Sequence, residues 1–99
     1  MESEKVTEKY LCQQVAKLGG IAYKFTSPSR RNVPDRICIL PKGIIVFVEL
    51  KSEPKKPTPA QEREMLRLQQ LGCFIDWANT KAMVNEIIQR MKEAINGAI

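Results

Sequence analysis

The fold of this chain is decided by residues 35–51, DRICILPKGIIVFVELK. Two apolar runs, 35–40 and 44–51, flank the turn Pro41-Lys42-Gly43, and this pattern predicts two antiparallel strands joined as a β-hairpin. Proline suits the first position of the turn, and glycine tolerates the positive φ that a three-residue loop requires at its last position. The second strand is apolar on both faces, so we expect it to lie inside a sheet that is covered on both sides.

The register of this hairpin places two acids opposite each other. If the turn centres on Lys42, Asp35 faces Glu49 across the two strands. The Cβ atoms of directly opposed side chains lie about 4.5–5.5 Å apart, and like charges at this distance destabilise a sheet. Lys51 emerges on the same face as Glu49, because side chains alternate along a strand. One ammonium group offsets only part of the repulsion between the two carboxylates.

A divalent cation with oxygen ligands would offset the rest. Proteins hold Mg²⁺ with one or two carboxylates, waters and substrate phosphate oxygens. The ion polarises a phosphate and lowers the pKa of a bound water, while Lys51 would orient the attacking water and neutralise charge on the phosphoryl oxygens. The alternative is a solvated strand end in which Glu49 and Lys51 form a surface ion pair. The facing Asp35, the apolar strand and a basic loop upstream favour phosphodiester hydrolysis with Mg²⁺ or Mn²⁺.

The segments on either side of the hairpin complete a mixed α/β fold. Apolar residues at helical spacing, short apolar runs and the positions of Gly, Pro and Thr predict seven elements. They are a helix over 4–18, strands over 21–25, 35–40 and 44–51, a helix over 58–71, a strand over 73–78 and a helix from Asn79. A strand, a crossover helix and a strand in succession imply a parallel pair beside the antiparallel hairpin. We therefore expect a mixed central sheet flanked by helices.

The composition indicates one globular domain over residues 1–99. Apolar residues make up 43% and charged residues 27%, which argues against disorder and against a fibrous repeat. The 16 Lys and Arg exceed the 11 Asp and Glu, and the net charge of +5 modestly favours a polyanionic partner such as DNA. No stretch approaches the ~18 apolar residues of a membrane helix, so we expect no membrane partner.

Three widely spaced cysteines, Cys12, Cys38 and Cys73, lie within apolar patterns of a chain that has no histidine. This spacing argues against a disulfide framework and against a zinc site, and it predicts that the cysteines are small core residues. A reducing cytoplasm is the compartment that suits them.

The hairpin also resembles a known nuclease motif. Val33-Pro34-Asp35, then a strand, then Glu49-Leu50-Lys51 is similar to the PD-(D/E)xK pattern, and the element order is similar to that superfamily's restriction-endonuclease-like core. Within the superfamily, the chain most resembles the stand-alone VRR-NUC domain, a virus-type replication and repair nuclease, over residues 8–72. The resemblance implies that Asp35, Glu49 and the backbone carbonyl of Leu50 ligate Mg²⁺ or Mn²⁺, and that Lys51 is the catalytic lysine.

The resemblance implicates two further polar residues, each with a structural alternative. Glu8 matches the glutamate that the family places in its first helix, but it fits a surface helix position equally well, and both interpretations are open. Gln61 shares a helical face with Met65 and Leu68 and matches a glutamine of the VRR-NUC pattern. Its alternative is a capping box with Thr58, and one side chain does not serve both roles at once. Of these we favour the active site.

Basic residues around the hairpin are candidate phosphate contacts, although loop charges are also commonly just solvated. They are Lys24, Arg30, Arg31, Lys55 and Lys56. Single-chain members of the resembled family look like junction resolvases, which implies a homodimer acting on branched or four-way DNA. The last helix carries an apolar stripe that one sheet face need not exhaust and that a symmetric dimer would use. The stripe comprises Met83, Val84, Ile87, Ile88, Met91 and Ile95.

Two rival functions belong to other classes. A nucleic-acid-binding module without catalysis would use the same basic loop, with the acidic face only structural. An interaction module would dock a partner protein through the last helix and would need neither metal nor DNA. Metal-dependent cleavage separates the nuclease from both.

Overall fold

The computed structural model describes residues 1–98. Every element that the sequence predicts is present, in the predicted order, with bounds that differ by a residue or two. The elements are α1 (Glu4–Lys17), β1 (Ile21–Lys24), β2 (Arg36–Ile39), the 3₁₀ turn η1 (Pro41–Gly43), β3 (Ile45–Leu50), α2 (Pro59–Gln70), β4 (Phe74–Ala78) and α3 (Lys81–Gly97). The last helix begins later than predicted, because its N-cap is Thr80, whose side chain accepts a hydrogen bond from the Met83 amide.

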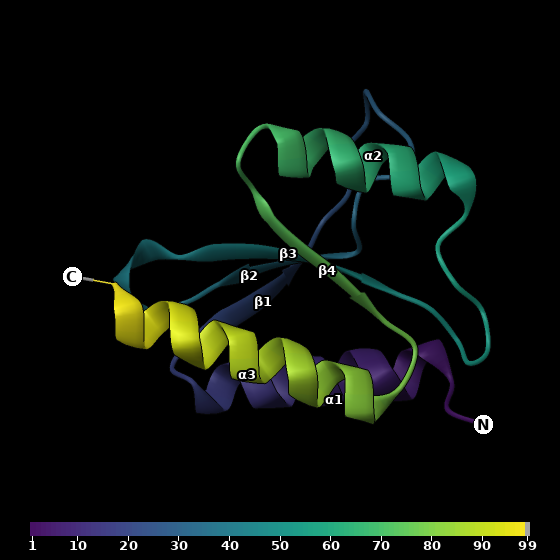
Figure 1. The fold of residues 1–99 in the computed structure, drawn as a ribbon. Coiled ribbons are helices and arrows are strands. Elements are labelled where there is room, and N and C mark those ends of the chain that lie inside the picture. The colour runs from purple at the N-terminus through teal and green to yellow at the C-terminus, as the bar shows by residue number, and fades with distance from the viewer. Residues whose placement is uncertain (99) are drawn as a thin grey trace.

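The four strands form one mixed sheet in the order β1-β2-β3-β4. β1 pairs with β2 and β2 with β3 in antiparallel orientation, whereas β3 and β4 run parallel. Helix α2 lies on one side of the sheet, and α1 and α3 lie together on the other (Figure 1). The predicted mixed sheet with helices on both faces is therefore confirmed. No helix within residues 1–98 has the length and apolar character that crossing a membrane requires.

The core lies between the sheet and the two helices α1 and α3. Alternate residues of β3, namely Val46, Val48 and Leu50, are buried there. They join one apolar cluster with Leu11 and Val15 of α1. The remaining buried members of this cluster are Cys38, Leu40, Ala78, Val84, Ile87, Ile88 and Met91. This burial supplies most of the favourable free energy of folding.

The prediction that α3 keeps part of its apolar stripe free is wrong. Val84, Ile87, Ile88 and Met91 are all buried, and Met83 and Ile95 pack against the core as well. The reason is that α3 contacts both β4 and α1, so two neighbours cover the stripe instead of one sheet face. The rationale for a dimer through this helix is lost.

The opposite face of the sheet is only partly covered. Ile21, Ile39 and Ile45 are register neighbours on three adjacent strands, and their exposed fractions are 52%, 38% and 45%. β4 lies at the other edge of the sheet, and its Phe74 is 59% exposed. Of the three cysteines, only Cys38 is a core residue, whereas the other two are half-buried.

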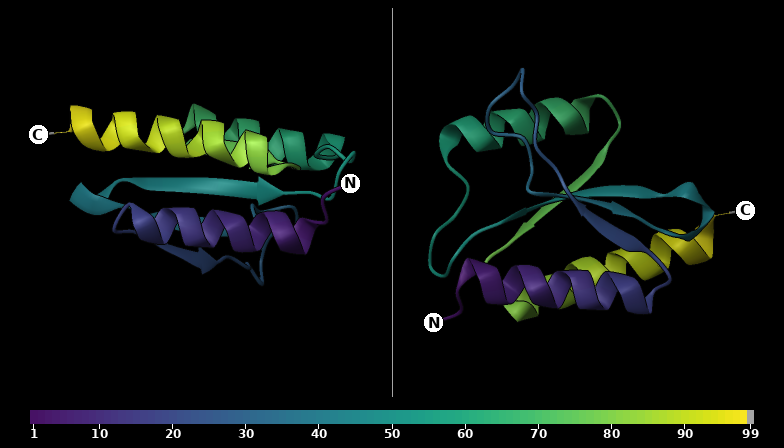
Figure 2. Two further views of the ribbon diagram at one scale, coloured as in Figure 1. Left: turned by 90° about the horizontal axis from the view of Figure 1, so that it is seen from below. Right: turned by 180° about the vertical axis from the view of Figure 1, so that it is seen from behind.

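The hairpin turn also holds the end of the last helix. Both Lys42 and Gly43 have positive φ values, 67° and 73°, so the left-handed region extends one residue further than predicted. The Lys42 ammonium donates hydrogen bonds to the carbonyl oxygens of Ile95 and Ala98, at 2.8 and 2.9 Å. A cation at this position adds hydrogen bonds to carbonyl oxygens at the end of the helix and complements its negative end. Figure 2 shows the turn beside the C-terminal end of α3.

Candidate active site

The hairpin register brings Asp35 and Glu49 together. Strand pairing sets Arg36 opposite Val48 and Ile39 opposite Ile45, which is the predicted register. One residue beyond the paired segment, Asp35 therefore stands opposite Glu49. Its Oδ2 accepts a hydrogen bond from the backbone amide of Leu50 at 2.8 Å, which holds the carboxylate at the end of β3.

Glu49 is a buried acid with an incomplete set of partners. Its side chain is 4% exposed, and among the described residues its Oε1 has no hydrogen-bond partner. Burial, followed by the charge of Asp35, raises the pKa of Glu49 to about 8. The Lys51 ammonium lies 3.6 Å from Oε2 and acts in the opposite direction. The three side chains thus form one charged group at the end of β3.

This donor set fits a divalent cation. Leaving a buried polar atom without a partner costs about 1–3 kcal/mol, and more when the group is charged. A hard cation between Asp35 and Glu49 would satisfy the free oxygen and remove the repulsion between the two acids. Within residues 1–98, no third Asp, Glu, His or Cys side chain completes a metal-holding group. The remaining ligands would be water, substrate oxygens and the Leu50 carbonyl, whose role stays a prediction.

The comparisons with known proteins agree with this site. No protein-family model matches the chain. A solved structure described as "VRR_NUC domain" superposes with a TM-score of 0.82 at 33% identity, covering 90% of this chain and 97% of the other. A curated protein named "Putative nuclease p44", from Acyrthosiphon pisum secondary endosymbiont phage 1, is 58% identical over 69 residues, which are 70% of this chain and 74% of that protein.

The chain belongs to the VRR-NUC family. It therefore shares the fold of a nuclease family, and its paired acids lie where the hairpin ends. In the VRR-NUC fold of this chain, Trp77 is the β4 neighbour of Glu49 in the register of the parallel pair. The register places this half-buried side chain on the same face of the sheet as Glu49. A hydropathy pattern cannot identify this neighbour, because the pairing of β3 with β4 depends on the crossover through α2.

Glu8 does not join the paired acids of this VRR-NUC chain. Its carboxylate Oε2 lies 2.9 Å from Nε of Arg36, which also donates to the carbonyl oxygen of Ala22 at 3.0 Å. Arg36 follows Asp35 directly, so its side chain points to the opposite face of the sheet, which α1 covers. The structure thus gives Glu8 a structural ion pair, and its part in catalysis stays a prediction.

Gln61 forms the capping box. Its side-chain Oε1 accepts a hydrogen bond from the backbone amide of Thr58 at 2.9 Å. The backbone amide of Gln61 donates in return to Thr58 Oγ1 at 3.2 Å. Our preference for an active-site role is therefore not supported, because the side-chain oxygen is already engaged at the start of α2. A part for Gln61 in catalysis stays a prediction.

The candidate phosphate contacts are all exposed on the surface. This holds for Lys24, Arg30, Arg31, Lys55 and Lys56. Arg30 differs from the others, because its Nη2 lies 2.9 Å from a carboxylate oxygen of Glu64 in α2. Sequence analysis missed Glu64 and its neighbour Arg67. Their spacing indicates a helical ion pair, but the sequence contains no signal that the 26–34 loop folds onto this helix.

Proposed function

We propose that this VRR-NUC chain is an endonuclease that hydrolyses DNA phosphodiester bonds with Mg²⁺ or Mn²⁺. The observation that carries the proposal is the opposed pair of Asp35 and Glu49, with a buried oxygen that lacks a partner and Lys51 3.6 Å away. The nuclease name of the phage relative and the likeness to a VRR-NUC structure support it.

Each residue of the site has a distinct part in this reaction. Asp35 and Glu49 would hold the metal ion, and the Leu50 amide keeps Asp35 turned toward the site. When bound, the ion supplies Lewis acidity to the phosphate and lowers the pKa of a coordinated water. Lys51 holds its ammonium beside Glu49, where it can orient the attacking water and neutralise negative charge that grows on the phosphoryl oxygens.

The proposal extends to a homodimer that acts on branched or four-way DNA. Two copies would present two sites to two strands of a branched substrate. The surface that suits such a contact is the exposed row of Ile21, Ile39 and Ile45 on the uncovered sheet face, because the stripe of α3 is buried. Contiguous exposed apolar side chains of this kind commonly mark an interface.

A panel of labelled DNA structures tests the proposal. Linear duplex, flap, single-stranded and four-way DNA are incubated with Mg²⁺, Mn²⁺ or EDTA. We expect the wild type to cut with either ion, with four-way DNA preferred, and not to cut in EDTA. Asp35→Asn and Lys51→Ala should lose at least about 100-fold in rate while DNA binding changes little.

The matched control is Asp76→Asn, which makes the same change in β4. Asp76 pairs with Arg90 of α3 on the other side of the sheet, so this variant should cut like the wild type. Absence of cutting by the wild type with both ions would leave a nucleic-acid-binding module as the better account. Full activity of Asp35→Asn would exclude the proposed site.

A further inference from the structure

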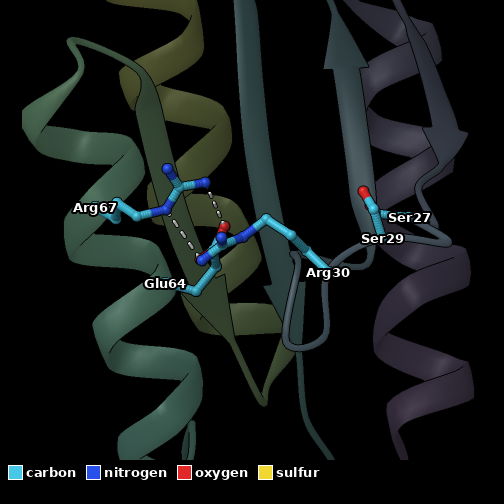
Figure 3. Close-up of polar contacts among 5 residues, drawn as sticks. All are labelled: Ser27, Ser29, Arg30, Glu64 and Arg67. Carbon is cyan, nitrogen blue, oxygen red and sulfur yellow. Dashed lines mark hydrogen bonds and ion pairs between the residues drawn. The ribbon is translucent and has the colours of Figure 1, made fainter.

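A cleft rich in arginine lies between the loop that precedes β2 and helix α2. Its volume is about 250 Å³. Four arginines and one carboxylate line it, so it carries an excess of positive charge. The polar and charged residues of its lining are Arg30, Arg31, Asn32, Arg63, Glu64 and Arg67. Figure 3 shows Arg30 reaching from the loop to Glu64 and Arg67 of the helix.

Glu64 holds two of these arginines in place. Its side chain is only 6% exposed, and its Oε1 lies 2.9 Å from Nη2 of Arg30 and 3.2 Å from Nε of Arg67. A second hydrogen bond joins Nη2 of Arg67 to Oε2 at 3.3 Å. Hydrogen bonding from Arg67, the largest cause, lowers the pKa of Glu64, so the carboxylate is charged at neutral pH. The contact fixes the loop to the helix.

The anchored arginines keep donors for a ligand. The side chains of Arg30 and Arg67 are 52% and 46% exposed although both bind Glu64. Each guanidinium has five N–H donors, and these contacts use at most two of them. In the part of the chain that the structure describes, no carboxylate lies within ion-pair distance of Arg31 or Arg63. One acid therefore leaves three positive charges uncompensated.

This chemistry selects a phosphate group. Planar guanidinium groups bind phosphate oxygens through two parallel hydrogen bonds, and arginine is preferred over lysine where such geometry matters. Because Glu64 already restrains Arg30 and Arg67, binding loses less side-chain entropy than it would with free arginines. A single bound phosphate would also relieve the repulsion among the four cations.

The cleft lies close to the proposed site along the chain. Arg31 precedes Asp35 by four residues, so their Cα atoms are at most about 14 Å apart. Nucleotides of one strand advance about 3.4 Å along the duplex axis. A phosphate in the cleft would therefore belong to the same substrate, within roughly four nucleotides of the bond that is cut.

We infer that this arginine cleft binds a backbone phosphate of the DNA away from the cleaved bond, with Glu64 as the positioning residue that holds Arg30 and Arg67 in place. The inference rests on the proposed function, because it takes DNA as the polyanion. It assigns DNA contact to Arg63 and Arg67 of α2, and it explains why an acid lies among the basic residues of a DNA-binding surface.

Fluorescence anisotropy with labelled four-way and duplex DNA in EDTA tests the inference without cutting. Arg63→Ala should weaken binding about 3- to 10-fold and reduce the slope of log K against log salt by about 0.9, the value for one lost phosphate contact. Arg90→Ala is the matched control, because Arg90 is also exposed but pairs with Asp76 on the α3 side. It should leave the slope unchanged.

Glu64→Gln separates positioning from simple electrostatics. The substitution removes one negative charge, so a nonspecific basic surface would bind DNA more tightly. We expect weaker binding, because Arg30 and Arg67 lose the acid that orients them. Arg63→Ala behaving like Arg90→Ala, or tighter binding by Glu64→Gln, would overturn the inference.

The two proposals fail in different ways. A wild type that binds DNA through the cleft but never cuts it would remove the proposed nuclease and leave the cleft intact. A wild type that cuts DNA, together with equal DNA binding by Arg63→Ala and Arg90→Ala, would remove the phosphate-binding cleft and leave the proposed nuclease intact. Circular dichroism of each variant checks the fold, and Arg63→Ala is informative even if Glu64→Gln unfolds, because Arg63 is exposed and has no carboxylate partner among residues 1–98.

Discussion

Glu49 shows how one residue links the stability of this protein to its proposed chemistry. The ordinary pKa of a glutamate is 4.5, and burial beside Asp35 raises that of Glu49 to about 8. Between these values the folded protein keeps a proton that the unfolded chain releases. The stabilisation is therefore complete below pH 4.5 and is lost as the pH rises toward about 8. Above that pH, the charge of Glu49 destabilises the site unless a cation is bound.

This linkage predicts a pH-dependent free energy of unfolding. In EDTA, urea denaturation of the wild type should give values that fall as the pH rises from 4.5 to about 8. Mg²⁺ should restore stability most at the upper end, because metal binding displaces the proton. Glu49→Gln should flatten the slope and abolish the Mg²⁺ effect. Identical slopes for the wild type and Glu49→Gln would show that another group is responsible.

At the scale of the element, the start of α2 has a capping motif at a residue to which the family resemblance gives another role. Thr58 and Gln61 exchange two hydrogen bonds with each other's backbone amides. These satisfy donors that the first turn of a helix leaves unpaired. Family resemblance could propose a catalytic amide here, but the sequence alone could not decide between the two roles, because both need the same residue at the same position.

Two substitutions at Gln61 distinguish the capping role from the catalytic role. Gln61→Glu preserves the acceptor for the Thr58 amide, so it should keep both the stability and the rate of DNA cleavage. Gln61→Ala should cost about 0.5–1.5 kcal/mol in free energy of unfolding, with cleavage unchanged under conditions where the variant is folded. Urea denaturation and the cleavage assay are measured side by side. A stable but inactive Gln61→Glu would return Gln61 to the active site.

At the scale of the whole molecule, the arrangement of layers decides which apolar surface is free. α1 and α3 lie on one side of the sheet and pack against each other, so the apolar stripe of α3 is buried within the chain. On the opposite side of the sheet, helix α2 contacts β4 and leaves the strands farther from β4 uncovered. Hydrophobic periodicity cannot reveal this difference, because it identifies an apolar face but not the element that packs on it.

The proposed homodimer would use this uncovered apolar surface. We expect the wild type to elute as a dimer in gel filtration with light scattering at micromolar concentration. Ile39→Lys should shift it to a monomer without lowering the stability of the monomer, since Ile39 is 38% exposed. Ile87→Ala is the control in the buried stripe of α3. It should lower the free energy of unfolding by about 2–5 kcal/mol while leaving the dimer interface intact. A monomeric wild type would contradict the dimer.

The sequence by itself determined the order of the elements, the hairpin register and therefore the opposition of Asp35 and Glu49. These features follow from turn geometry and side-chain alternation, which act over a few residues. Only the tertiary structure decided that Glu8 pairs with Arg36, 28 residues away, and that Arg30 meets Glu64, 34 residues away. Such contacts depend on how layers pack, and no local preference of the chain encodes them.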